Sequence, residues 1–147
     1  MRFLVPIGGC IDDAFGILTT YQHHGVVVGI RAGLPWAADN CAFGDKFDPV
    51  RFAEWLPRMH PWRVTCLFVV VPDVVADSMA TLTRWYEWVP KLAGWPLAFV
   101  CQDGQENLDV PWDNCAAVFI GGATEWKMGA HAAAIVKASK VIGKWCH

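Results

Sequence analysis

Residues that could recognise a flat, hydrogen-bonding ligand follow four short segments of the chain. Asp39 lies in LPWAADNCAF, Asp73 in FVVVPDVVAD, Gln102 in LAFVCQDGQ, and Gly121-Gly122 in VFIGGATEWK. An ionised carboxylate accepts hydrogen bonds, an amide both donates and accepts them, and glycine lets a backbone approach a ligand closely. In α/β proteins such residues build sites at the carboxyl ends of parallel strands. The four segments therefore predict a binding site.

Both aspartates have two interpretations that the sequence leaves open. Asp39 precedes an asparagine, which is good turn chemistry, but at a strand end its carboxylate could also transfer protons. Asp73 follows Pro72, which keeps Val71 extended. The Asp73 carboxylate could cap a turn or helix, or its two oxygens could accept from the ring N–H and the amino group of a guanine-type base.

The amide and the glycines are equally open to two interpretations. Gln102 is a loop residue or a group whose NH₂ donates to a carbonyl. Gly121 and Gly122 form a turn, or they admit a flat ligand to which their backbone N–H groups donate. Trp36 and Trp126 are near these residues in the sequence, and either ring could stack on a base.

The segments that must position these residues alternate between strand and helix. The patterns predict strands over residues 2–7, 25–30, 65–71, 97–101, 116–120 and 144–147, and helices over 12–24, 49–58, 77–91 and 125–141. Expected helix caps are Asp12 or Asp13, Asp48 and Asp77. Two helix faces are expected to be apolar or small: Met79, Leu82, Tyr86 and Val89, and Ala130, Ala133, Ala134 and Ala138. This alternation is typical of an α/β fold with a parallel sheet.

The number of these units sets the expected architecture. The 147 residues supply about five βα units, whereas a complete (β/α)₈ barrel of the TIM type needs roughly 200 residues or more. We therefore expect residues 1–147 to be a single α/β domain. It would be either a small open sheet or a partial TIM-type barrel that lacks its C-terminal part.

Composition excludes several classes of protein. The chain is 54% hydrophobic with a net charge of −2 and a mean hydropathy of +0.29, which indicates buried strands or a surface that meets a partner. The sequence has no run of Lys or Arg, which a polyanion-binding domain would be expected to have. No apolar stretch reaches the roughly 18 residues that a membrane span needs. We expect a cytoplasmic protein with six cysteine thiols, no cofactor and, since CxxC spacing is absent, no metal.

Taken together and in order, the four segments resemble the tRNA-guanine transglycosylase superfamily. The phrases DNCAF and FIGGATEWK carry the most specific likeness, and the resemblance extends from about Leu34 to the last residue. It is closest to the short phage and bacterial members, which insert 7-deazaguanine bases into DNA. The resemblance implies a (β/α)₈ barrel that exchanges guanine for a deazaguanine through a covalent sugar–aspartate intermediate.

The resemblance also implies a role for each candidate residue. Asp39 corresponds to a proton-transfer carboxylate near the base, and Asp73 to the aspartate that reads the N–H edge of the base. Gln102 and Gly122, beside Gly121, correspond to the groups that contact the base carbonyl. The expected ligand is a purine or 7-deazaguanine base, and DNA is favoured over tRNA because the zinc-binding cysteines of the tRNA-acting members have no counterpart here.

One part of the family pattern has no counterpart. The nucleophilic aspartate of the family lies beyond His147, and Asp103, Asp109 and Asp113 stand in the wrong context to replace it. The sequence thus predicts either an exchange enzyme completed by a complementary C-terminal chain or a base-binding fragment. The alternative is a non-catalytic interaction module whose sheet edges pair with a second chain or in a homo-oligomer.

Overall fold

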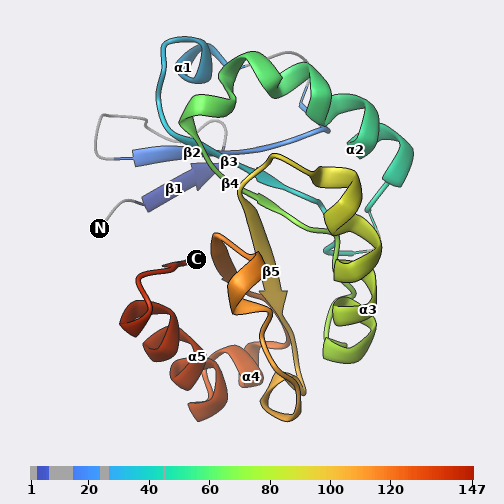
Figure 1. Cartoon of the computed structure of the whole chain (residues 1–147), viewed down its shortest axis with the longest axis vertical. Coiled ribbons are helices and arrows are strands. Elements are labelled where there is room, and N and C mark those ends of the chain that lie inside the picture. Colours follow the sequence, from blue (N-terminus) through green and yellow to red (C-terminus); the bar gives the residue numbers. More distant parts are fainter. Residues whose placement is uncertain (1–2, 7–14, 24–26, 45) are drawn as a thin grey trace. The chain divides into compact units, whose positions relative to one another are not determined.

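The computed structural model describes residues 3–6, 15–23, 27–44 and 46–147, which divide into two compact units. Unit 1 spans Met1–Val69 and unit 2 spans Val70–His147. Each unit combines helices with parallel strands (Figure 1). The predicted α/β class with parallel strands is therefore confirmed, and the two units are described separately below.

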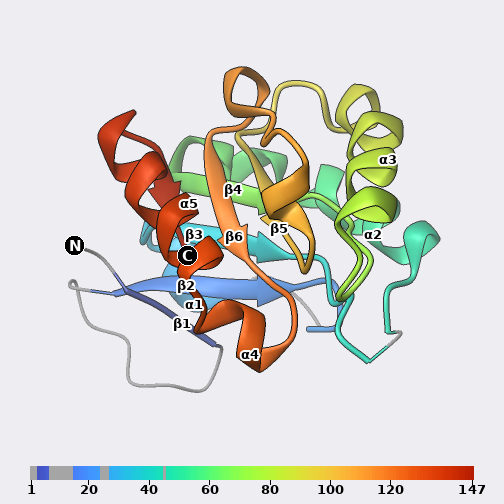
Figure 2. The same ribbon diagram turned by 90° about the horizontal axis from the view of Figure 1, so that it is seen from below.

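Unit 1 contains parallel strands paired in chain order. They are β1 (Phe3–Pro6), β2 (Phe15–Thr20), β3 (Trp36–Asp39) and β4 (Cys66–Val70), with β1 next to β2, β2 next to β3, and β3 next to β4. Figure 2 shows β2 and β3 side by side with their arrowheads at the same end. The side chains of Ile17, Trp36 and Phe68 are fully buried and form the core of this unit.

Two sequence predictions in unit 1 are wrong. Residues 15–20, expected to be helical, form β2, and residues 28–30, expected to belong to a strand over 25–30, lie in the short helix α1 (Val28–Arg31). Strand β3, which was not predicted, ends at Asp39. The physical reason is tertiary pairing: β2 lies between β1 and β3, which outweighs local propensity. The expected cap at Asp12 or Asp13 lies outside the described residues.

The connection from β3 to β4 follows its predicted pattern. Helix α2 (Pro49–Trp55) begins after Asp48, whose Oδ1 accepts from the backbone N–H groups of Val50 and Arg51 at 3.0 Å each. Pro49 occupies the first helical position, where its missing N–H costs nothing. A 3-10 helix, η1 (Leu56–Thr65), then leads into β4, so that the α-helix ends three residues earlier than expected.

Unit 2 contains strands β5 (Leu97–Cys101), β6 (Ala117–Ile120) and β7 (Trp145–Cys146), which pair in parallel in that order. Val71, directly after β4, donates its N–H to the Ala98 carbonyl of β5 at 3.1 Å. All five residues of β5 are buried, as expected for a strand covered on both faces. The carboxyl ends of these strands lead into the segments that contain Gln102 and Gly121.

The helices of unit 2 are α3 (Ser78–Trp88), α4 (Thr124–Lys127) and α5 (Ala130–Val141), with 3-10 helices η2 (Val89–Leu92), η3 (Gln105–Asn107) and η4 (Trp112–Asn114). Asp77 caps α3 as predicted, since its Oδ1 accepts from Ala80 N–H at 2.9 Å. Figure 1 shows α3 running beside β5. The predicted helix over 125–141 is two helices, because the chain turns at Met128 and Gly129.

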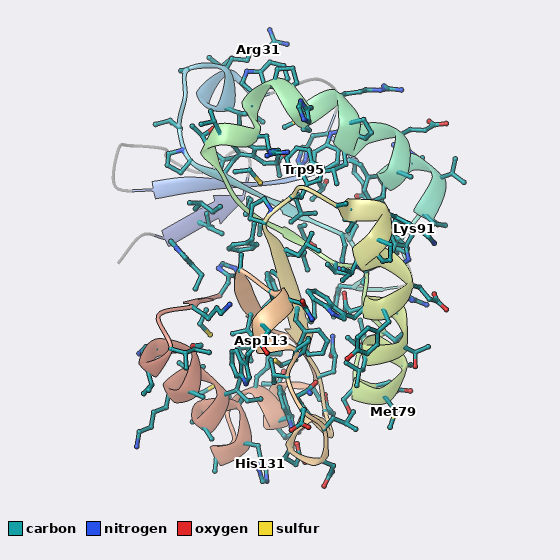
Figure 3. The ribbon with its side chains drawn as sticks, viewed as in Figure 1. Arg31, Met79, Lys91, Trp95, Asp113 and His131 are labelled. Carbon is teal, nitrogen blue, oxygen red and sulfur yellow. The ribbon has the colours of Figure 1, made fainter. Side chains whose placement is uncertain are left out.

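The buried faces of these helices differ from the expected ones. On α3 the buried residues are Ser78, Thr81, Trp85 and Trp88, whereas Met79, labelled in Figure 3, is 59% exposed and Tyr86 is 62% exposed. On α5 the buried residues are Ala132 and Ser139, and the expected alanine face is mostly exposed. Trp85 explains the difference on α3, because its ring packs edge-on against Phe99 of β5 with centroids 5.3 Å apart.

Candidate functional site

Asp73 and Gln102 meet as a buried pair in unit 2. The Nε2 group of Gln102 donates to Oδ2 of Asp73 at 2.5 Å, across 29 positions of sequence. Asp73 is 6% exposed and Gln102 is 1% exposed. Asp73 lies three residues after β4, and Gln102 directly follows β5. Two residues that the sequence singled out separately are therefore direct partners.

The orientation of the Gln102 amide is fixed by the backbone. The N–H of Ala76 donates to Oε1 of Gln102 at 2.9 Å, so that the Nε2 group is the part of the amide that faces Asp73. Ala76 has φ of +61°, a left-handed conformation that is uncommon for a residue with a side chain. Since a backbone N–H can only donate, the amide is held with its oxygen toward Ala76.

Helix α3 holds the segment that carries Asp73. The hydroxyl of Thr81 accepts from Val74 N–H at 2.9 Å and donates to the Val74 carbonyl at 3.0 Å. The guanidinium of Arg84 donates to the Asp73 carbonyl at 2.7 Å. These bonds fix the backbone on both sides of the Asp73–Val74 peptide. Sequence reasoning did not find Thr81 or Arg84, because a polar residue inside an amphipathic helix gives no sign of what it contacts. It did not find the Ala76 N–H either, because a backbone group that donates to a distant side chain leaves no mark in the sequence.

Gly121 lies against the Gln102 amide. Its N–H donates to the Cys101 carbonyl at 2.9 Å, which brings the two strand ends together. A Cβ atom at Gly121 would lie 2.6 Å from Nε2 of Gln102 and 2.8 Å from Cγ1 of Val100, closer than side-chain atoms pack. Glycine is therefore required here, because the Gln102 amide and the Val100 side chain occupy the place that a side chain would take.

Gly122 faces a different set of residues. It has φ of +85°, and a Cβ atom there would clash with Oδ2 of Asp103 and lie 3.0 Å from the Trp126 ring. The same Asp103 oxygen accepts from Ala123 N–H at 2.8 Å. The side chain of Asp103 thus fixes the turn after β6. Gly122 serves this turn, whereas Gly121 borders the Asp73–Gln102 pair.

Trp126 is held by an acidic side chain at this turn. Its Nε1–H donates to Oε2 of Glu106 at 2.9 Å, and this hydrogen bond lowers the pKa of the Glu106 carboxyl. Trp36, the other tryptophan considered for stacking, is fully buried in unit 1 and donates its Nε1–H to the Trp62 carbonyl at 2.9 Å. Trp36 is a core residue, which rules out the stacking role for it.

Asp39 belongs to unit 1 and ends strand β3. Its Cα pairs with that of Thr20 on β2, and its Oδ1 accepts from Cys41 N–H at 3.0 Å. This is the local hydrogen bond of an aspartate that shapes a turn. Cys41 has φ of +60°, and burial raises the pKa of its thiol, with the Asp39 charge acting in the same direction. The proton-transfer role of Asp39 stays a prediction.

The remaining donor groups define no metal site in the described part of the chain. No group of three or more His, Cys, Asp or Glu residues there could hold a metal ion. Cys41, Cys66, Cys101, Cys115 and Cys146 are free thiols. Among the described helices, none is both long and apolar enough to cross a membrane.

No protein-family model, no curated protein and no solved structure matches this chain. Of the predicted site residues, Asp73, Gln102 and Gly121 come together in unit 2, Gly122 is adjacent on the turn, and Asp39 ends a strand of unit 1.

Proposed function

We propose that unit 2 binds the hydrogen-bonding edge of a guanine-type base, with Asp73 and Gln102 as the recognition pair. The observation that carries this proposal is the fixed orientation of the Gln102 amide between Ala76 N–H and the Asp73 carboxylate. The pair then presents carboxylate oxygens, which accept, beside an NH₂ group, which donates.

Guanine and 7-deazaguanine match this pattern. Their Watson–Crick edge offers two donors, the N1–H and the 2-amino group, beside one acceptor, the 6-carbonyl oxygen. The carboxylate of Asp73 would accept from the two donors, and Nε2 of Gln102 would donate its second hydrogen to the carbonyl. Gly121 lies beside Nε2 and carries no side chain there. Adenine presents an acceptor at N1 and a donor at its 6-amino group, so that it opposes both contacts.

We further propose that the base comes from DNA and that the fold is a partial TIM-type barrel of the transglycosylase kind. A base in a duplex must be flipped out of the stack before its edge can be read. The supporting observations are the parallel strands linked by helices in both units and the resemblance of the four segments. In this proposal Asp39 transfers protons. Base exchange additionally needs a complementary chain with a nucleophilic aspartate, because the resemblance assigns none here.

Isothermal titration calorimetry with 7-deazaguanine tests the recognition pair. Asp73→Asn keeps the shape of the side chain but removes one acceptor and the charge, and should weaken binding by about tenfold or more. Asp77→Asn is the matched control, because Asp77 is exposed and asparagine also caps helices well. Equal loss in both variants, or wild-type protein that binds nothing at millimolar 7-deazaguanine, would refute the proposal.

A further inference from the structure

A pair of aromatic rings lies in the row of side chains next to the Asp73–Gln102 pair. Val100 of β5 is in register with Phe119 of β6. His147 donates its N–H to the Val118 carbonyl at 3.0 Å and accepts from Ile120 N–H at 2.8 Å, which sets it opposite Phe119. The rings of Phe119 and His147 are in contact, with centroids 4.8 Å apart and planes 43° apart.

This row faces the same side of the strands as the recognition pair. Side chains alternate between the two faces along a strand, so that Gly121 shares its face with Phe119, two residues earlier. A Cβ atom at Gly121 would approach Nε2 of Gln102 and Cγ1 of Val100, which assigns both of these side chains to that face. The ring of Phe119 therefore lies one row from the Gln102 amide on the neighbouring strand, and the imidazole of His147 lies in the same row as Phe119, one strand further away.

The turn residue Trp126 lies beside Gly122. The atoms nearest to a Cβ atom at Gly122 belong to Asp103 and Trp126, whereas those nearest to a Cβ atom at Gly121 belong to Gln102 and Val100. Phe119 is half-buried and His147 is exposed. A planar ligand whose edge meets Asp73 and Gln102 and whose ring passes over Gly121 would approach Phe119 first and then His147, which lies one strand further along.

We propose that Phe119 and His147 form the stacking surface for the bound base, with His147 in contact with the purine ring and Phe119 as the residue that positions the imidazole. This inference rests on the proposed function and adds to it the residues that contact the face of the base, whereas Asp73 and Gln102 read its edge. Bases stack on histidine and phenylalanine rings in single-strand and flipped-base recognition.

Affinity measurements on ring variants provide the first test. By calorimetry, His147→Ala should weaken 7-deazaguanine binding by about 5-fold to 100-fold, the range for loss of one base–aromatic contact. His147→Phe keeps an aromatic ring and should stay within about threefold of wild type. His131→Ala is the matched control, because His131 is an exposed histidine at the start of α5, labelled in Figure 3. Its affinity should not change.

Proton NMR distinguishes contact between His147 and the base from a purely structural role of His147. The His147 ring signals, assigned by their absence in His147→Phe, should shift when 7-deazaguanine is added and should not shift with 7-deazaadenine. Unchanged affinity in His147→Ala and unmoved ring signals, together with binding that Asp73→Asn abolishes, would overturn the stacking surface and leave the proposed function standing. Wild-type protein that binds no 7-deazaguanine would overturn both.

Discussion

The Gln102 amide has one orientation that satisfies its neighbours. A reversed amide would set its NH₂ group against the Ala76 N–H and its oxygen against the Asp73 carboxylate, so that both hydrogen bonds would be lost. Buried polar groups without partners cost about 1 to 3 kcal/mol each. The orientation of this one side chain determines whether the site presents a donor or an acceptor to a ligand.

Replacement of Gly121 by alanine should disturb this orientation. The new Cβ would overlap Gln102 Nε2 and Val100, which should destabilise the fold by about 1 to 3 kcal/mol and weaken 7-deazaguanine binding by about tenfold or more. Thermal unfolding and calorimetry would measure the two effects.

Gly143→Ala is the control for this variant. Gly143 has φ of +71° and no atom within 4 Å of its Cβ position, so that alanine there should cost about 1 to 2 kcal/mol of stability through strain. Its affinity for 7-deazaguanine should stay at the wild-type value. Full affinity in Gly121→Ala would contradict the role assigned to the Gln102 NH₂ group.

The sequence identified Asp73 and Gln102 because each interrupts the apolar pattern near a strand end. It did not reveal that they are partners, because the contact spans 29 positions and depends on how two strands align. Nor did it reveal Ala76, since alanine in a left-handed conformation looks like any other alanine in a sequence.

At the scale of the elements, helix α3 supports the site through polar groups on its buried face. Thr81→Val keeps the shape of the side chain but removes both hydrogen bonds to Val74. We expect a loss of about 1 to 3 kcal/mol in the free energy of unfolding, because two part-buried backbone groups lose their partner. Chemical denaturation would measure this loss, and calorimetry should show weaker 7-deazaguanine binding.

Thr83→Val provides the comparison on the same helix. Thr83 is exposed, and its hydroxyl donates only to the Met79 carbonyl one turn earlier. This variant should change stability by less than about 0.5 kcal/mol. If Thr81→Val were as stable as Thr83→Val, α3 would not hold the Asp73 segment.

The elements of unit 2 were more predictable than those of unit 1. Strand β5 matches its predicted range, because a fully buried apolar run flanked by proline and polar residues has few alternatives. In unit 1 the valine-rich run at residues 26–30 suggested a strand, yet Val28–Arg31 is helical. Strand β3 was not predicted, because Ala37 and Ala38 have low β-propensity. In the structure both residues are fully buried.

At the scale of the whole molecule, the described cysteines should react slowly. Burial raises the pKa of Cys66 to about 12 and also raises the pKa of Cys101, Cys115, Cys41 and Cys146. At pH 8 each group lies below its raised pKa and is therefore the neutral thiol, whereas the thiolate is the form that reacts.

Alkylation with iodoacetamide at pH 8, followed by peptide mass spectrometry, would test this prediction. Peptides with Cys66 and Cys101 should stay unmodified in the native protein and react fully in denaturant. Half-buried Cys41 and Cys146 should react before Cys101, which is fully buried, as the pH is raised. Native Cys66 that reacts as fast as a cysteine in a free peptide would contradict the raised pKa of its thiol.

The central claim is that this protein distinguishes a guanine edge from an adenine edge. The most direct measurement is a pair of calorimetric titrations of the wild-type chain, one with 7-deazaguanine and one with 7-deazaadenine, which share a ring system and differ at the hydrogen-bonding edge. We predict binding of 7-deazaguanine and at least about a hundredfold weaker binding of 7-deazaadenine, because both edge contacts would be opposed. Equal affinity for the two bases, or binding of neither, would contradict the account.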